Sequence, residues 1–333
     1  GWEVVALDNM SAGEPLHKWH DPVSPHSVRF ASTWDIRCIA LTWDVRRGVA
    51  TMGHPDEYDL IIHCAAIVGG RLKIDNAPFD VAVNLEIDAA FFRWVIGARP
   101  SAFGSDLKPK VIYFSSSAVY PVELQQRLQY IKLAEPLVTQ GATRFGRPDS
   151  VYGWAKLTGE LLAHYAVEQY GADVLVYRPF SGYGEDQSFD YPFPSIIRRI
   201  VDRENPITIW GSGEQCRDFI HIDDIVEAVM QTKDVLKPGD VLNLGTGIAT
   251  SFKQLVLAAC AATNIRIGTV VSDEAGYKSS LTFECDTTKP EGVFYRVADT
   301  YKLSQFYKPR ITLEEGIRRV AKHLTEAKKK CSE

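Results

Sequence analysis

Residues 1–15 read GWEVVALDNMSAGEP, and this stretch decides the fold that we expect. The apolar run Glu3–Leu7 predicts a short β-strand, and it leads directly into Asp8, Asn9 and a turn that contains Gly13. A strand that ends in an acidic residue is typical of the second strand of a dinucleotide-binding unit, where the carboxylate binds the adenosine ribose. The alternative is that Asp8 and Asn9 only cap a turn.

The position of Asp8 also predicts what precedes it. In a dinucleotide-binding unit the glycine-rich turn that holds the phosphates lies about 20 residues before the acid. We therefore expect the first strand, that turn and most of the first helix, roughly 20–30 residues, upstream of Gly1. Gly13 is no substitute, because it follows the acid. We expect residues 1–333 alone to be unstable and inactive, because the backbone amides that bind the pyrophosphate would be missing. An acid at this place repels a 2′-phosphate, which favours NAD over NADP.

Further apolar runs recur along the chain with helical stretches between them. The runs are Cys38–Thr42, Leu60–His63, Val111–Phe114, Val174–Tyr177 and Val241–Leu244, and the helical stretches include Val81–Ile96, Tyr152–Tyr170 and one after His221. Several runs are continuous rather than alternating, which is expected of parallel strands covered on both faces. We predict an α/β fold, a Rossmann-type doubly wound parallel sheet with a smaller C-terminal substrate domain. The NAD-binding domain would comprise residues 1–178 plus about 220–248, and the substrate domain about 179–219 plus 249–333.

The composition excludes several classes of partner. The chain has 333 residues, 45% hydrophobic and 24% charged, with a net charge of -5. This acidic balance argues against nucleic acid and against an anionic membrane surface as partners. The six cysteines show no CxxC pair and no histidine spacing typical of a metal site. We therefore expect reduced thiols, no metal and a cytoplasmic location.

Two stretches carry residues suited to catalysis. SVYGWAKLTGE (150–160) puts Tyr152 and Lys156 four residues apart on one helix face, where an ammonium would lower the pKa of the phenol toward neutrality. VIYFSSSAVYP (111–121) ends a buried strand in three serines, at the carboxyl edge where α/β sheets bind ligands. The alternatives to a catalytic role are that Tyr152 and Lys156 are two exposed helix residues, and that the serines only cap the end of the strand. Asp44, after the next strand in IALTWDVRR (39–47), is placed to meet the adenine, or is simply an acid at a strand end.

Together these stretches resemble the extended short-chain dehydrogenase/reductases, the NAD-dependent nucleotide-sugar epimerase/dehydratase family. The resemblance covers residues 4 to about 247 and rests on VVALDNMSAG, IIHCAAIVGG, VNLEID, FSSSAVYP, YGWAKLTGE, YRPFSGYGED, IWGSGEQCRDFIHIDDIVEAV and LNLGTG. It implies that Tyr152 is the acid/base, that Ser116 is the catalytic serine, and that Lys156 also binds the nicotinamide ribose.

The same resemblance implies two binding sets. For NAD they are Asp8, Asn9, Asp44, Val45, Ala65, Ala66, Asn84, Ser115 and Phe180, together with Tyr152 and Lys156. For a nucleotide-diphosphate sugar they are Ser117, Ser181, Arg217 and Arg296. A guanidinium suits the diphosphate, and a surface ion pair is the alternative for each arginine. Relatives pair the two long helices in a four-helix bundle, so we expect a homodimer.

Departures from the family pattern narrow the reaction. Dehydratases carry acids after the catalytic serine, where this chain has Ser117 and Ala118. GDP-fucose synthase and GDP-mannose 3,5-epimerase place a cysteine where Ala118 stands, and near their second acid/base this chain offers Asp190 and Tyr191. We therefore predict epimerisation at C4 through a transient 4-keto sugar. The alternatives are a 4,6-dehydratase, a GDP-fucose synthase-like epimerase/reductase, and a non-catalytic nucleotide-binding or regulatory protein of the same fold.

Overall fold

The computed structural model describes residues 3–9, 11, 37–42, 44–48, 52–97, 109–139, 141–143, 145–266 and 281–332. The longer helices are α3 (Pro78–Ile96), α4 (Ser150–Tyr170), α5 (Pro192–Val201), α6 (Ile222–Thr232), α7 (Phe252–Ala262) and α8 (Leu313–Ser332); α1 (Val45–Gly48) and α2 (Arg71–Asn76) are short. The strands are β1 (Glu3–Asp8), β2 (Arg37–Thr42), β3 (Leu60–His63), β4 (Lys110–Phe114), β5 (Val138–Thr139), β6 (Ala142–Thr143), β7 (Asp173–Pro179), β8 (Ser181–Tyr183), β9 (Ile207–Trp210), β10 (Cys216–Arg217), β11 (Phe219–His221), β12 (Val241–Leu244), β13 (Thr250–Ser251), β14 (Phe283–Asp286) and β15 (Tyr295–Arg296).

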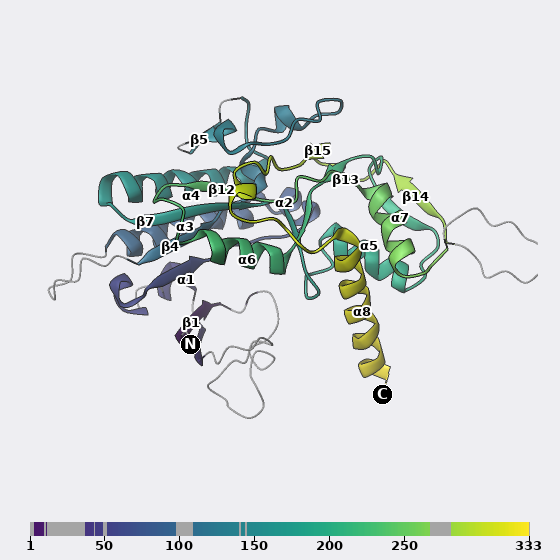
Figure 1. Ribbon diagram of the computed structural model, residues 1–333, viewed down its shortest axis with the longest axis horizontal. Helices are drawn as coiled ribbons and strands as arrows, with labels where there is room; N and C mark the ends of the chain where they lie inside the picture. The colour runs from purple at the N-terminus through teal and green to yellow at the C-terminus, as the bar shows by residue number, and fades with distance from the viewer. Residues whose placement is uncertain are drawn as a thin grey trace, which may run out of the picture.

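A four-stranded parallel sheet in the order β12-β7-β4-β3 forms the centre of the molecule. Helices α3 and α4 lie on one side of this sheet and α6 on the other (Figure 1). The structure confirms the predicted α/β class and the parallel sheet, and each apolar run predicted as a strand is one. The site residues that follow β4 therefore lie at the carboxyl edge of a central strand.

The continuous apolar strands supply both faces of the sheet. Val111 and Tyr113 of β4 pack with Phe91 of α3 on one face. Ile112, between them in sequence, packs with Ile225 of α6 on the other face. All three β4 side chains are fully buried. Successive side chains point to opposite faces of a strand, so a strand covered on both sides must be apolar throughout.

Strands β1 and β2 form a separate two-stranded parallel sheet. Their register pairs Asp8 with Thr42, so the carboxyl ends of both strands lie together. This is the predicted place of the two acids that follow these strands, Asp8 and Asp44.

A third hydrophobic core lies among α5, α7 and α8, to the right of the central sheet in Figure 1. Ile197, Leu255 and Ile317 are fully buried there. Strands β9 and β14 pair in parallel beside it. Between this core and the sheet, β10 pairs with β15 so that Arg217 lies opposite Arg296. No helix in the described ranges combines the length and the apolar character needed to cross a membrane.

Candidate active site

A cavity of about 710 Å³ lies between the central sheet and the hydrophobic core formed by α5, α7 and α8. Its lining includes seven of the residues predicted for catalysis or binding, from five separate parts of the chain: Ser116, Ser117, Tyr152, Phe180, Ser181, Arg217 and Arg296. The volume lies in the range of ligand pockets for small molecules. The chain thus brings its candidate catalytic residues and its candidate anion-binding arginines to one cavity.

Helix α4 holds Tyr152 against the turn that follows β4. The Asp149 amide donates to the Ala118 carbonyl oxygen at 2.8 Å, and the Gly153 amide donates to the Asp149 carbonyl oxygen at 2.9 Å. A Cβ on Gly153 would lie 2.4 Å from the Ala118 oxygen, so only glycine allows this approach. Tyr152 and Ser116 are thereby held in one rigid unit.

The predicted lowering of the Tyr152 pKa is not found. Burial, followed by the nearby Tyr191, raises the pKa of Tyr152 well above its ordinary value, and the Ser116 hydroxyl only partly opposes this rise. The Lys156 ammonium donates to the Phe114 carbonyl oxygen at 3.0 Å and lies over the Tyr113 ring. It is not aimed at the phenol, and burial lowers its own pKa. The phenol is therefore protonated at neutral pH and can act as a proton donor.

Ser116 and Ser117 occupy the turn at the end of β4. The Ser116 side-chain oxygen accepts a hydrogen bond from the Ala118 amide at 3.1 Å, so the serine caps this turn and also faces Tyr152. Ser117 is buried beside it in the cavity wall. Ser116 therefore caps the turn, as the alternative predicted, and it also lines the cavity.

The two candidate arginines differ in their partners. Arg296 donates through Nε to Gln125 Oε1 at 2.7 Å and through Nη2 to Asp149 Oδ2 at 2.8 Å. Arg217 donates to the Cys216 carbonyl oxygen at 2.8 Å, and no carboxylate of the described residues forms a salt bridge with it. Burial and the positive charge of Arg296 lower the pKa of Arg217. A buried guanidinium in a cavity wall that forms no salt bridge with a described carboxylate is suited to bind an anion.

The residues predicted to bind NAD near β3 and β4 are not part of the cavity lining. The Asn84 side chain accepts from the Ile67 amide at 2.6 Å and donates to the Ile67 carbonyl oxygen at 2.9 Å, so it fixes the loop that contains Ala65 and Ala66. The Ser115 hydroxyl donates to Glu160 Oε1 at 2.5 Å, away from the cavity. Ala65, Ala66, Asn84, Ser115 and Lys156 do not line the cavity.

Asp8, Asn9, Asp44 and Val45 lie at the carboxyl ends of β1 and β2, also outside the cavity lining. Asn9 accepts hydrogen bonds from the amide and hydroxyl of Ser11, which is the predicted turn-capping alternative. Asp44 binds the Arg46 side chain, and this contact lowers the pKa of Asp44 although burial opposes it. Val45 packs against the core between the sheet and α3.

Two parts of the site were not predicted from the sequence. Asp149 bridges Arg71 and Arg296, and all three residues line the cavity. Behind Lys156, buried Asp88 accepts from Tyr113 Oη at 2.6 Å and contacts His63 Nε2 at 2.9 Å. Asp149 lies three residues before Tyr152 in the sequence, and this spacing could have indicated that Asp149 belongs to the site. The partners of Asp88 are set by the packing of α3 on β4.

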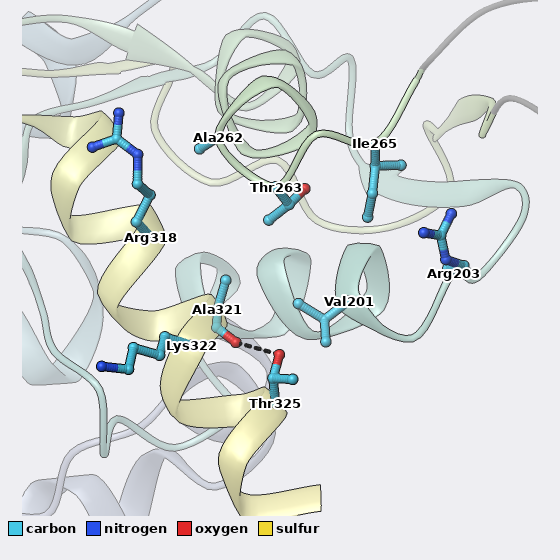
Figure 2. Close-up of a pocket in the computed structure, with 9 residues that line it drawn as sticks. All are labelled: Val201, Arg203, Ala262, Thr263, Ile265, Arg318, Ala321, Lys322 and Thr325. Carbon is cyan, nitrogen blue, oxygen red and sulfur yellow. Dashed lines mark hydrogen bonds between the residues drawn. The ribbon is translucent and has the colours of Figure 1, made fainter. Parts of the chain in front are cut away.

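A smaller hollow of about 300 Å³ lies among α5, α7 and α8, and Figure 2 shows its lining. It contains none of the predicted site residues. Arg318 at its rim is paired with Glu314 and Glu315, and Lys322 points away from the hollow (Figure 2). Among the residues that the structure describes, no group of three His, Cys, Asp or Glu side chains could hold a metal ion.

Comparison with known proteins agrees with this geometry. The family model described as NAD dependent epimerase/dehydratase family matches residues 1–245. A putative GDP-L-fucose synthase of Arabidopsis thaliana is 26% identical over 270 residues, 77% of this chain and 73% of the relative. A putative UDP-glucose 4-epimerase of Methanocaldococcus jannaschii is 26% identical over 327 residues, 96% of this chain and 89% of the relative.

Solved structures share the fold. The crystal structure of UDP-glucose 4-epimerase from Thermotoga maritima with UDP-glucose aligns with a TM-score of 0.74 at 18% identity, over 98% of this chain and 92% of that one. UDP-glucuronic acid 4-epimerase from Bacillus cereus, solved with UDP-glucuronic acid and NAD, aligns with a TM-score of 0.70 at 22% identity, over 87% and 82%. The family match covers more than half of the chain, and the chain therefore belongs to the NAD dependent epimerase/dehydratase family.

Proposed function

We propose that this protein is an NAD-dependent isomerase that epimerises a nucleotide-diphosphate sugar at C4 through a transient 4-keto intermediate. One observation carries the proposal: Ser116 and Tyr152 share a cavity with Arg217, a guanidinium that forms no salt bridge with a described carboxylate. The arginine supplies a charge that suits a diphosphate. The serine and the tyrosine supply hydroxyl groups that can bind and protonate a sugar oxygen.

The residues on the sheet edge fit NAD as the cofactor of this family. Asp8 ends β1, and the small residues Ala65 and Ala66 follow β3, so each position lies at the carboxyl end of a parallel strand, which is the end at which α/β proteins bind dinucleotides. We propose that Asp8 binds the adenosine ribose, that Asn9, Asp44 and Val45 lie near the adenine, and that Ser115, Phe180 and Lys156 lie near the nicotinamide half. When bound, NAD supplies reversible hydride transfer at the sugar carbon.

The chain's own residues then have separate roles. The minor ionised form of Tyr152 accepts the proton of the sugar 4-hydroxyl when C4 is oxidised and returns that proton when C4 is reduced again, and Ser116 orients the hydroxyl. Arg217 holds the diphosphate, which anchors the nucleotide while the keto sugar turns in the cavity. Ser117 and Ser181 line the wall without adding a charge. Epimerisation at C4 needs no further base, because the hydride returns to the opposite face of the same carbon.

An epimerase/reductase of the GDP-fucose synthase type is the second candidate, because GDP-L-fucose synthases are among the curated relatives. Such chemistry needs a group that deprotonates a ring carbon. Tyr191 and Asp190 line the cavity and are the titratable side chains nearest in sequence to the place where such relatives carry that group. Dehydration is disfavoured, because Ser117 and Ala118 follow Ser116 where an acid is needed.

The test is to incubate the full-length protein with NAD and a panel of UDP-, GDP- and dTDP-hexoses in heavy water, and to follow the sugars by proton NMR. Inversion at C4 with no deuterium at C3 or C5 supports direct hydride return. Deuterium at C3 or C5, a 4-keto-6-deoxy product or net consumption of reduced cofactor contradicts it. Tyr191→Phe and Asp190→Asn are then the first variants to make.

We also propose a cytoplasmic homodimer. Trp154 and Tyr165 on α4 and Leu85 on α3 are large, apolar and between 40% and 51% exposed. Trp154, Leu161 and Tyr165 follow helical spacing along one face of α4. Cys64, Cys216, Cys260 and Cys285 are free, which supports a reducing compartment. Sedimentation equilibrium of the wild type and of Trp154→Glu tests the dimer.

A further inference from the structure

Asp149 lies at the junction of the two catalytic segments, immediately before α4. Its amide donates to the Ala118 carbonyl oxygen at 2.8 Å, and its carbonyl oxygen accepts from the Gly153 amide at 2.9 Å. These bonds fix the Asp149 backbone between the turn that carries Ser116 and the first turn of α4, which carries Tyr152. Its carboxylate lines the same cavity. Asp149 and Tyr152 therefore both contribute to the wall that a ligand in this cavity would contact.

The Asp149 side chain does not cap α4, although an aspartate at this position usually does. Instead Oδ1 accepts from Arg71 Nη1 and Oδ2 accepts from Arg296 Nη2, each at 2.8 Å. The Asp149 and Arg296 side chains are both 12% exposed. Burial favours the neutral carboxyl, but Arg296 and Arg71 outweigh it and hold the pKa of Asp149 below its ordinary value. The group is an oriented, permanently ionised acceptor.

The partners divide the arginines into two kinds. Arg296 is committed to Gln125 and Asp149, and Arg71 is committed to Asp75 and Asp149. Arg217 forms no salt bridge with any carboxylate that the structure describes. Arg217 is thus the cation left for a diphosphate, while Arg71 and Arg296 orient a carboxylate.

The charge of Asp149 decides which part of a nucleotide-diphosphate sugar it can contact. A carboxylate repels phosphate oxygens, so it would weaken binding of the diphosphate. An ionised carboxylate has about four acceptor sites, and the two arginine contacts use two of them. Sugar hydroxyls are hydrogen-bond donors and suit the remaining sites. The bond from a neutral hydroxyl to a charged acceptor is among the stronger ones in proteins.

We propose that Asp149 is a specificity-determining residue that accepts hydrogen bonds from hydroxyl groups of the sugar, and that Arg71 and Arg296 are positioning residues that hold its carboxylate. This inference rests on the proposed function, because it takes a nucleotide-diphosphate sugar as the ligand. It assigns sugar recognition to the start of α4 and to α2, and diphosphate recognition to β10.

Calorimetric titration of the full-length protein, with NAD present, tests the proposal with two ligand pairs, UDP-glucose against UDP and GDP-mannose against GDP. In Asp149→Asn the nucleotide sugar that the wild type binds should bind about 10- to 100-fold more weakly, as for loss of a hydrogen bond to a charged group. The matching nucleoside diphosphate should bind equally well or more tightly, because a negative charge beside Arg217 and Arg296 has been removed. Arg71→Gln should show the same split with a smaller factor, and Arg71→Lys should restore part of it.

The matched control is Asp75→Asn, which removes the other carboxylate partner of Arg71 and lies outside the cavity lining. It should leave the ratio of the two affinities within about 2-fold of the wild type, below the effect of a single hydrogen bond. Parallel weakening of nucleotide and nucleotide sugar in Asp149→Asn, or no change in either, would overturn the sugar-recognition role while leaving the proposed function intact. A wild type that binds neither nucleotide sugar overturns both.

Discussion

Tyr152 and Lys156 show that burial acts on neighbouring ionisable groups in opposite directions. The pKa of Tyr152 is raised and that of Lys156 is lowered, and in both cases the largest cause is loss of hydration around the charged form. Each neutral form is thus favoured in the folded protein. A permanent tyrosinate at position 152 is therefore disfavoured in the folded protein.

Lys156 gives a pH dependence of stability with a definite sign. In the unfolded chain a lysine keeps its proton up to about pH 10.4, whereas buried Lys156 releases it at a lower pH. Between these two values the unfolded state binds more protons, so stability rises with pH. We expect wild type to gain stability relative to Lys156→Met as the pH rises from about 8 to about 10. Urea denaturation at several pH values measures this gain, with exposed Lys132→Met as the control; a difference that stays constant contradicts it.

Arg217 and Arg296 should respond differently to the same substitution. Arg217→Met should weaken UDP or GDP binding about 10- to 100-fold without lowering the melting temperature, because the wild type buries this cation without a carboxylate partner. Arg296→Met should lower the melting temperature, because Asp149 and Gln125 each lose a hydrogen bond. Calorimetry and thermal scans of the two variants make the comparison. A lower melting temperature of Arg217→Met would show that the folded protein stabilises the Arg217 charge, and would contradict this prediction.

At the scale of elements, α4 approaches β4 unusually closely because of its glycines. A Cβ on Gly159 would lie 1.9 Å from Tyr113 Oη and 2.7 Å from Asp88 Oδ2. Tyr113 and Asp88 are buried and hydrogen-bonded to each other, so neither can move away cheaply. The close approach brings Lys156 within hydrogen-bond distance of β4.

Gly159→Ala should therefore destabilise the protein by about 1–3 kcal/mol, the usual range for overpacking a core. The sign is diagnostic, because alanine in place of glycine inside a helix normally stabilises it by about 1 kcal/mol. The exposed variant Gln169→Ala, late in the same helix, is the control and should be nearly neutral. Chemical denaturation gives the free energies. A more stable Gly159→Ala would mean that α4 can shift away from Tyr113 at little cost.

The helices and strands could be predicted from the sequence where the pattern that indicates them lies within the element itself. The strands on both sides of the site are continuous apolar runs, and Tyr152 and Ser116 follow from spacing on a helix and at a strand end. The Asp149 contacts were not predictable, because Arg71 and Arg296 are 78 and 147 residues away in sequence. The Tyr152 pKa was predicted wrongly for the same reason. This pKa depends on burial and on the electrostatic effect of Tyr191, and neither can be deduced from the spacing of residues in the sequence.

At the scale of the whole molecule, Arg178 connects segments that surround the site. It is fully buried in β7 and forms a two-pronged ion pair with Glu160 of α4, at 2.8 Å from Nε and 2.7 Å from Nη2. It also donates to Tyr120 Oη and to the carbonyl oxygens of Glu135 and Val138. The central sheet, α4 and the segment before β5 thus meet at one side chain.

This network predicts a specific order of stabilities. Glu160→Gln should cost about 3–5 kcal/mol, because it leaves the Arg178 charge buried without its partner. The double variant Arg178→Met/Glu160→Leu should be more stable than Glu160→Gln, since it buries no charge. It should still be less stable than wild type, because the carbonyl oxygens of Glu135 and Val138 lose their donor. Urea denaturation of these variants and of the two matching single variants, Arg178→Met and Glu160→Leu, closes the cycle. Single-variant losses that simply add in the double variant would mean that the pair contributes no interaction energy of its own, and that backbone contacts alone join the three segments.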